Sequence, residues 1–63
     1  MNFKENLKKL RLKKGLTQPQ LAKLLNKPLP TVRNWEQGKN QASYESWELL
    51  TKILECDYNE LLK

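Results

Sequence analysis

The chain has 63 residues, of which 38% are hydrophobic and 30% are charged, and its formal net charge is +5. This length suits one small domain over residues 1–63, with no apolar run near the roughly 20 residues of a membrane span and no visible signal peptide. One cysteine and no histidine exclude an intramolecular disulfide and an ordinary zinc site and remove the commonest general base, so we expect a cytoplasmic, non-catalytic module without metal, cofactor or small-molecule ligand.

The first predicted helix covers residues 3–14, and Asn2 followed by Glu5 forms a capping box at its start. Apolar residues recur at helical spacing and make the stripe that we expect to be buried: Phe3, Leu7 and Leu10. Leu12 lies outside this stripe and is expected to be exposed. Gly15 ends the helix.

The second predicted helix begins at residue 18, after a capping box formed by Thr17 and Gln20. Pro19 is tolerated there because the first turn of a helix has no internal acceptor for its N–H groups. Its core-facing residues repeat at helical spacing: Leu21, Leu24 and Leu25, with the small Ala22 beside them. Asn26 accepts a left-handed conformation, so we expect it to end this helix in a tight bend.

The third predicted helix follows this bend. Pro28 and Pro30 forbid a continuous helix through the bend but suit the first turn of a new one. Val32 and Trp35 are expected to face the core, and Gly38 ends the helix. The residues expected to face outward are Leu29, Arg33, Asn34 and Gln37. Helix, bend and helix over residues 18–37 predict the helix-turn-helix unit that places its second helix in the DNA major groove.

The last third of the chain predicts a loop and two further helices. Ser43 caps a fourth helix that extends to residue 54, and Asp57 with Glu60 forms a capping box for a short helix over residues 58–62. The core-facing stripe of the fourth helix consists of Trp47, Leu50 and Leu54, with Ile53 beside it. The sequence therefore predicts an all-α fold, a compact five-helix bundle with a central helix-turn-helix.

The residues around the predicted bend also resemble a known family. The segments that carry the resemblance are Gly15-Leu16-Thr17-Gln18, Leu21-Ala22, Thr31-Val32 and Trp35-Glu36-Gln37-Gly38-Lys39. They are similar to the Cro and phage-repressor-like helix-turn-helix domains, often called XRE, and the resemblance extends over about residues 7–62. It implies a DNA-binding domain of the phage-repressor type.

The chain departs from the usual pattern of this family at three places. The bend is Asn26-Lys27-Pro28 where the family usually has Gly-Val-Ser, so an apolar anchor and a hydroxyl cap are lost. The base-reading start of the next helix is Leu29-Pro30 where the family is usually polar. Ala42 stands in place of a proline after the Gly-Lys pair. All three departures concern base reading rather than the fold.

Base contacts are expected from Arg33, Asn34 and Leu29. Arginine can hold guanine O6 and N7 with two hydrogen bonds, and asparagine can pair with adenine N6 and N7. The alternative for both is an ordinary exposed position on a helix. Leu29 could contact a thymine methyl group, or it could pack into the core in place of the apolar anchor missing at Lys27.

Contacts with the DNA backbone are expected from both ends of the unit. Thr17 and Gln18 begin a helix, with free backbone amides and a favourable dipole for a phosphate. The resemblance gives the phosphate-binding role to Gln18, and Thr17 can cap the helix at the same time. Thr31 could touch a phosphate or only stabilise the start of its helix. The loop residues expected to reach a phosphate or the minor-groove edge are Lys39, Asn40 and Gln41.

Arg11 and Glu36 are interpreted as structural residues. In the resembling family, the matching positions form an ion pair that ties the first helix to the recognition helix. Arginine suits such a partly buried, two-pronged pair. A phosphate contact by Arg11 is the alternative.

Three further residues are also assigned to packing. Trp35 and Trp47 lie on apolar stripes, which favours the core over a stacking platform for single strands. Cys56 is expected to be a small buried residue, because nothing in its surroundings marks it as reactive.

The charge distribution is uneven along the chain. Residues 1–40 hold ten Lys or Arg and two acids, a net charge of +8, whereas residues 41–63 hold two lysines and five acids, a net charge of −3. A lysine run by itself fits a solvated surface equally well. Because the helix-turn-helix lies in the same segment, the basic half is better interpreted as a phosphate-facing surface, and the acidic half should point away from DNA.

The sequence therefore predicts specific double-stranded DNA binding by a small transcriptional regulator of bacterial, phage or plasmid type, located in the cytoplasm or nucleoid. With no room for a ligand-sensing second domain, repression by occupying a promoter, often that of its own operon, is the simplest mechanism. One recognition helix reads few base pairs, so we expect a homodimer, at least on DNA, on an inverted-repeat operator. The candidate dimer contacts are Tyr58, Leu61 and Leu62, and the alternative for these residues is that they only seal the core.

Two alternative functions come from other classes. A protein-interaction module that kept the fold without DNA binding is favoured by the unusual residues 27–30 and opposed by the basic first half. An enzyme such as a nuclease would need clustered carboxylates for a metal, and no acid occurs between Glu5 and Glu36.

Overall fold

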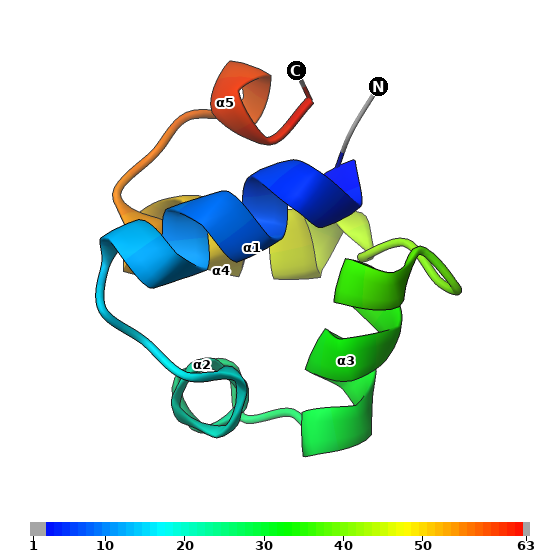
Figure 1. Ribbon diagram of the computed structural model, residues 1–63. Helices are drawn as coiled ribbons and strands as arrows, with labels where there is room; N and C mark the ends of the chain where they lie inside the picture. Colours follow the sequence, from blue (N-terminus) through cyan, green and yellow to red (C-terminus); the bar gives the residue numbers. More distant parts are fainter. Residues whose placement is uncertain (1–2, 63) are drawn as a thin grey trace.

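The computed structural model describes residues 3–62, and within this range the chain forms helices and no strand (Figure 1). In chain order, the helices are α1 (Phe3–Lys13), α2 (Gln18–Leu25), α3 (Leu29–Gln37), α4 (Tyr44–Leu54) and α5 (Tyr58–Leu62). The all-α fold with five helices and a helix-turn-helix is thus confirmed. Asn2, the predicted cap of α1, lies outside the described residues.

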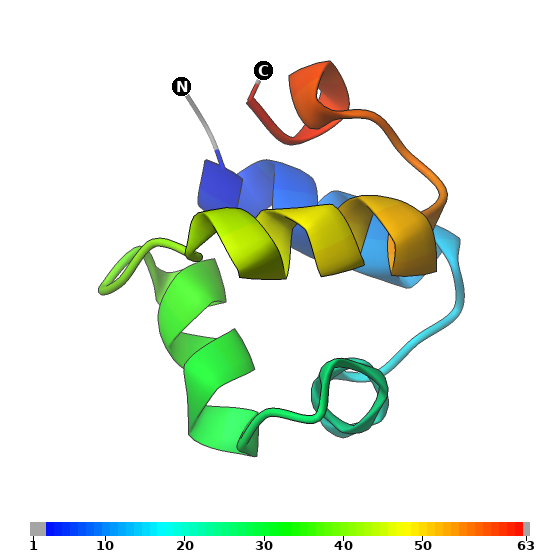
Figure 2. The same ribbon diagram turned by 180° about the vertical axis from the view of Figure 1, so that it is seen from behind.

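The helices form three levels, which can be followed in the two opposite views of Figures 1 and 2. α1 and α4 cross the middle of the molecule, and α5 packs on α1 at the side where the described part of the chain ends. α2 and α3 occupy the opposite side, where α3 packs on both α2 and α1, and α2 packs on α4. The helix-turn-helix unit therefore projects from a platform made by the other three helices.

Local caps end the helices where the sequence predicts. Asn26 has φ 59° and Gly38 has φ 79°, both left-handed, so α2 and α3 stop at these residues. Ser43 Oγ accepts the backbone N–H of Ser46 at 3.3 Å and caps α4. α1 ends one residue earlier than predicted, at Lys13, because the N–H of Lys14 is shared between two carbonyls before the left-handed Gly15.

A single apolar core joins the helices. Its buried members are Phe3, Leu7, Leu21, Ala22, Leu25, Val32, Trp35, Leu50, Leu54 and Leu61. The partly buried residues packed against it include Leu10, Trp47, Ile53 and Cys56. The ring of Trp47 stacks on Phe3, with centroids 5.0 Å apart, which joins α4 to α1. Both tryptophans therefore take part in packing, as predicted, although Trp47 is only half-buried.

Leu24 and Cys56 differ from their predicted environments, and of the two environments left open for Leu61 the structure shows the core. Leu24 was placed on the core stripe of α2 but is 57% exposed, because α3 and α4 cover the opposite side of this short helix. Leu61 is fully buried against the core. Cys56 is half-buried, and burial, followed by the nearby carboxylates of Glu60 and Asp57, raises the pKa of its thiol. A raised pKa keeps the thiol protonated at neutral pH.

None of the helices formed by the described residues is both long enough and apolar enough to cross a membrane.

Two leucines of α1 provide a test of this core. Leu7 has no exposed surface, whereas Leu12 on the same helix is 57% exposed. We expect Leu7→Ala to lower the free energy of unfolding by about 2–5 kcal/mol, because it removes buried methyl groups and leaves a cavity. The matched control Leu12→Ala should change it by less than about 0.5 kcal/mol. Urea unfolding followed by circular dichroism measures both, and equal losses would contradict the burial of Leu7.

Candidate nucleic-acid interface

The outward surface of α3 is the centre of the candidate interface. Arg33 and Gln37 are exposed on it, as predicted, and Pro30 is exposed one turn before Arg33. Leu29 and Asn34 are half-buried rather than fully outward, because they lie at the borders of the face that carries the buried Val32 and Trp35. Among the three residues predicted to read bases, Arg33 is therefore the most exposed to solvent.

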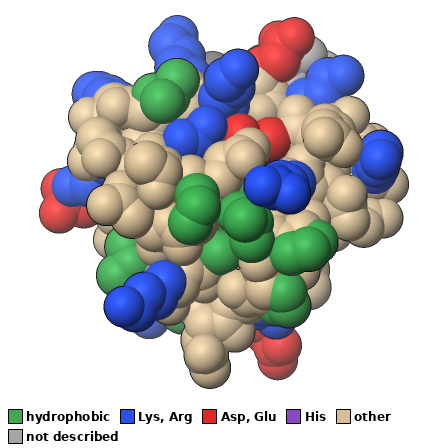
Figure 3. Space-filling view, turned by 60° about the horizontal axis from the view of Figure 1, so that its bottom comes forward, with side chains coloured by type: hydrophobic (Ala, Val, Ile, Leu, Met, Phe, Trp, Pro, Cys, Tyr) green, Lys and Arg blue, Asp and Glu red, His purple; other side chains and the backbone are tan. Residues whose placement is uncertain are grey.

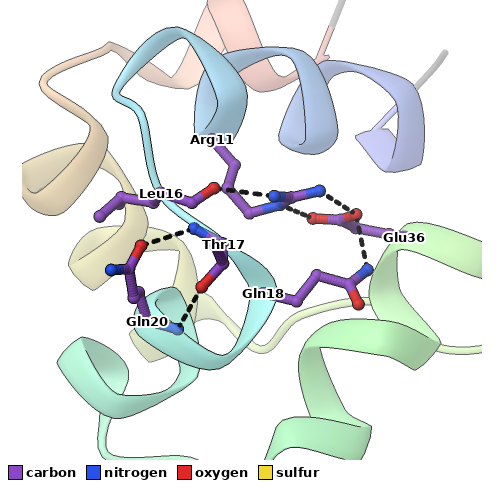
Figure 4. Close-up of polar contacts among 6 residues, drawn as sticks. All are labelled: Arg11, Leu16, Thr17, Gln18, Gln20 and Glu36. Atoms are coloured by element: carbon purple, nitrogen blue, oxygen red, sulfur yellow. Dashed lines mark hydrogen bonds and ion pairs between the residues drawn. The ribbon is translucent and has the colours of Figure 1, made fainter.

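The start of α2 is closed by the predicted capping box. Gln20 donates its backbone N–H to Thr17 Oγ1 at 3.2 Å, and Thr17 donates its own N–H to Gln20 Oε1 at 2.8 Å (Figure 4). Thr17 therefore has no free backbone amide, contrary to the expectation from sequence. Pro19 has no N–H. Of the N–H groups in this first turn, that of Gln18 is therefore the one available to donate a hydrogen bond to a phosphate.

A buried ion pair joins α1 to α3. Arg11 Nε donates to Glu36 Oε2 at 2.7 Å, and Arg11 Nη2 donates to Glu36 Oε1 at 3.1 Å. The two side chains are only 7% and 4% exposed. This is the two-pronged pair that the resemblance placed at these positions, and its geometry is the fork that guanidinium and carboxylate groups form. With two of its N–H groups directed at Glu36, Arg11 is placed for structure rather than for a phosphate contact.

The ion pair extends to the start of α2. Arg11 Nη1 donates to the carbonyl oxygen of Leu16 at 2.8 Å, and Gln18 Nε2 donates to Glu36 Oε1 at 3.0 Å (Figure 4). The carboxylate of Glu36 thus receives N–H groups from α1 and α2 while it is carried by α3. The bond from Gln18 to Glu36 is not predicted by the sequence, because no local signal links two residues that are 18 positions apart.

The loop after α3 places the remaining predicted backbone-contacting residues in solvent. Lys39, Asn40 and Gln41 are all exposed, while Thr31 is half-buried near the start of α3. Gly38 lies beneath the side chain of Lys4, whose Cδ would be 3.0 Å from a Cβ added at this glycine. Gly38 therefore combines a left-handed backbone with a close approach of α1, and any side chain there would push against Lys4.

The surface formed by α2 and α3 combines apolar and basic side chains. Figure 3 shows hydrophobic side chains gathered near the middle of this face, with Lys and Arg side chains around them. The exposed hydrophobic residues of the unit and its bend are Pro19, Leu24, Pro28 and Pro30. The exposed basic residues of this part of the chain are Lys23, Lys27, Arg33 and Lys39. A basic rim of this kind attracts a polyanion and is screened by salt.

Two helices joined by a tight bend, with an exposed arginine on the outward face of the second and lysines around it, are typical of a helix-turn-helix protein. In agreement with this class, the family model described as "Helix-turn-helix" matches residues 7–61. The chain therefore belongs to the helix-turn-helix family of Cro and phage-repressor type, whose members are DNA-binding transcription regulators.

One curated relative is similar over almost the whole chain. The HTH-type transcriptional activator BcrR of Enterococcus faecalis is 39% identical over 62 residues, which cover 98% of this chain and 30% of that protein. The chain thus spans about 30% of the length of this relative. No solved structure matches the chain at a significant level.

The buried ion pair generates a stability prediction. Arg11→Ala or Glu36→Ala should lower the free energy of unfolding by about 3 kcal/mol, because each leaves the other charge buried without its partner. Exposed Lys8 is the control, and Lys8→Ala should cost less than about 0.5 kcal/mol. Thermal or urea unfolding measures all of these variants.

The double variant makes this test more specific. Removing Arg11 and Glu36 together should cost less than the sum of the two single losses, because no uncompensated charge remains. Strictly additive losses, or melting temperatures equal to that of Lys8→Ala, would show that the pair contributes nothing to stability.

Proposed function

We propose that this chain binds double-stranded DNA in a sequence-specific manner and regulates transcription from the site that it occupies. The observation that carries the proposal is the exposed Arg33 on the outward face of a helix that Glu36 fixes in place. In the major groove, an arginine at this position can read guanine through O6 and N7. Asn34, half-buried beside it, is assigned a secondary role in reading adenine.

The contacts with phosphate are assigned to the ends of α2 and α3. The free backbone N–H of Gln18 lies at the positive end of the α2 dipole, which favours an anion. Its side chain is held by Glu36, so the contact with phosphate is made by the backbone more than by the side chain. Lys39, Asn40 and Gln41 contribute from the exposed loop, and Thr31 from the start of α3.

Repression by promoter occupancy is the proposed mode of regulation, and residues 1–63 are proposed to act as one DNA-binding domain. Activation is the second candidate, because the relative from Enterococcus faecalis is a transcriptional activator. A reporter gene behind the chain's own upstream region distinguishes the two, because its expression should fall with a repressor and rise with an activator.

A gel-shift titration with the upstream region of the gene tests the proposal directly. We expect a retarded band at protein concentrations at which a shuffled DNA of the same length remains free. Equal retardation of both DNAs would exclude specific binding. No retardation of either DNA would favour the protein-interaction module that has the fold without DNA binding.

Three variants should separate base reading from phosphate holding. Arg33→Ala should cost on the order of 1–3 kcal/mol of binding free energy on the operator and much less on random DNA, because it removes a base contact. Lys39→Ala should weaken both DNAs alike and lower the salt slope by about one unit. Gln18→Ala should weaken both, because it removes the hydrogen bond to Glu36 that holds the start of α2 in place, but it changes no charge and should leave the slope nearly unchanged. Titrations on both DNAs at several salt concentrations measure these effects.

The Arg33 variant can contradict this assignment. If Arg33→Ala lost equal affinity on operator and random DNA, Arg33 would hold a phosphate rather than read a base. The reading of the operator would then rest with Asn34 and Leu29.

Pairing of two chains on an inverted repeat is also proposed, with half-sites about one helical turn, roughly 34–36 Å, apart. Leu61 is excluded as a contact because it has no exposed surface. Tyr58 and Leu62 are 37% and 41% exposed, and the ring of the exposed Tyr44 lies 6.4 Å from that of Tyr58. These three side chains are the candidate contacts between the chains.

Sedimentation with operator DNA should therefore show two chains per site. Leu62→Asp should shift the complex toward one chain per DNA, because it places a charge in an apolar contact. Leu12→Asp, at another exposed leucine, is the matched control and should leave the stoichiometry unchanged. A one-to-one complex of the unmodified chain on a sequence without a repeat would contradict pairing.

A further inference from the structure

The first turn of α3 is unusually apolar for a helix that faces DNA. Three consecutive residues, Pro28, Leu29 and Pro30, form what we call the apolar tip. Pro28 and Pro30 are exposed and Leu29 is half-buried. Pro28 occupies the cap position with φ −64°, and no side chain caps the helix there. The tip therefore exposes hydrocarbon to solvent at the N-terminal end of α3.

The tip also has few hydrogen-bonding groups. Pro28 and Pro30 have no backbone N–H, and the N–H of Thr31 is already donated to the carbonyl of Pro28 at 3.0 Å. Leu29 is left with the one free backbone N–H of this turn. None of the three side chains has a donor or an acceptor. The paired hydrogen bonds with which arginine, asparagine or glutamine identifies a base are therefore not available to the tip.

The charges around the tip indicate the kind of partner that it meets. Lys27 precedes the tip and Arg33 follows it by one turn, and both are exposed. The hydrophobic side chains of this face lie among basic ones in Figure 3. An apolar surface with a basic rim, on the outward helix of the unit, is complementary to a phosphate-lined groove whose floor carries apolar groups.

On the major-groove edges of the bases, the apolar group is the C5-methyl of thymine. We propose that the apolar tip reads thymine by packing Leu29 and Pro30 against this methyl group, so that each operator half-site contains a thymine fixed by the tip. The inference rests on the proposed function. It gives the tip a selectivity for thymine that comes from burial of the C5-methyl group and not from hydrogen bonds. Arg33 reads its base by hydrogen bonds one turn further along α3.

Deoxyuridine provides the test, because it lacks the C5-methyl of thymine and keeps the same hydrogen-bonding edge. The operator is first selected with the unmodified chain from random synthetic DNA, in which thymine is the base that carries a C5-methyl. Each thymine of one half-site is then replaced by deoxyuridine, one at a time. At one or two positions, binding should become about fourfold weaker, the factor expected for one buried methyl group.

Variants connect this loss to the tip. In Leu29→Ala or Pro30→Ala, the same deoxyuridine substitution should change affinity by less than about twofold, because the contact has already been lost. Lys27→Ala is the matched control: it should weaken binding to both DNAs and retain the fourfold difference between them. Melting curves of each variant show that the binding assays are made on folded protein.

The remaining outcomes overturn the inference. A selected half-site without thymine, or one in which no deoxyuridine weakens binding by more than about twofold, would exclude methyl reading. A deoxyuridine effect that stays unchanged in both tip variants would assign the methyl to another residue. If the selection returned no preferred sequence, the proposed function itself would fail, which is distinct from the loss of methyl reading on a defined operator.

Discussion

The buried carboxylate of Glu36 is the constraint on which the helix-turn-helix geometry depends. A carboxylate with so little exposed surface would be costly without donors, and it finds them in Arg11 and Gln18. These donors come from α1 and from the first turn of α2, while Glu36 itself belongs to α3. The hydrogen bonds to this one carboxylate therefore fix α1, α2 and α3 relative to one another. The guanidinium also neutralises a negative charge close to the surface that is proposed to meet phosphates.

The ends of the helices are set by local backbone chemistry and need little from the rest of the fold. Asn26 and Gly38 stop α2 and α3 in left-handed conformations, and the prolines of the bend suit only the first turn of a helix. Within α2, the same chemistry has a functional consequence. Thr17 and Gln20 use each other's N–H groups, and this leaves the backbone of Gln18 as the available donor for an anion.

The proposed interface divides its tasks among chemically different residues. The charge that attracts DNA comes from the basic first half of the chain, whereas the acidic residues are concentrated in residues 41–63, the segment that contains α4 and α5. Arg33 offers hydrogen bonds, and the apolar tip offers burial. The departure from the family pattern at Leu29 and Pro30 thus offers apolar groups where the family usually has polar ones, while Val32 and Trp35 still pack α3 on the core.

The sequence by itself determined the features that depend on neighbours along the chain. Capping boxes, left-handed stops and helical spacing involve residues up to four positions apart, so the helices, their ends and most of the core could be predicted, along with the family. Side-chain environments that depend on distant helices could not. Leu24 is exposed because α3 and α4 pack on the other side of α2, and Leu61 is buried because α5 packs on α1. The ion pair of Arg11 with Glu36 was expected only through the family resemblance, and the bond from Gln18 was not expected at all. Only the tertiary structure decides such contacts, because it brings together residues that are 18 and 25 positions apart.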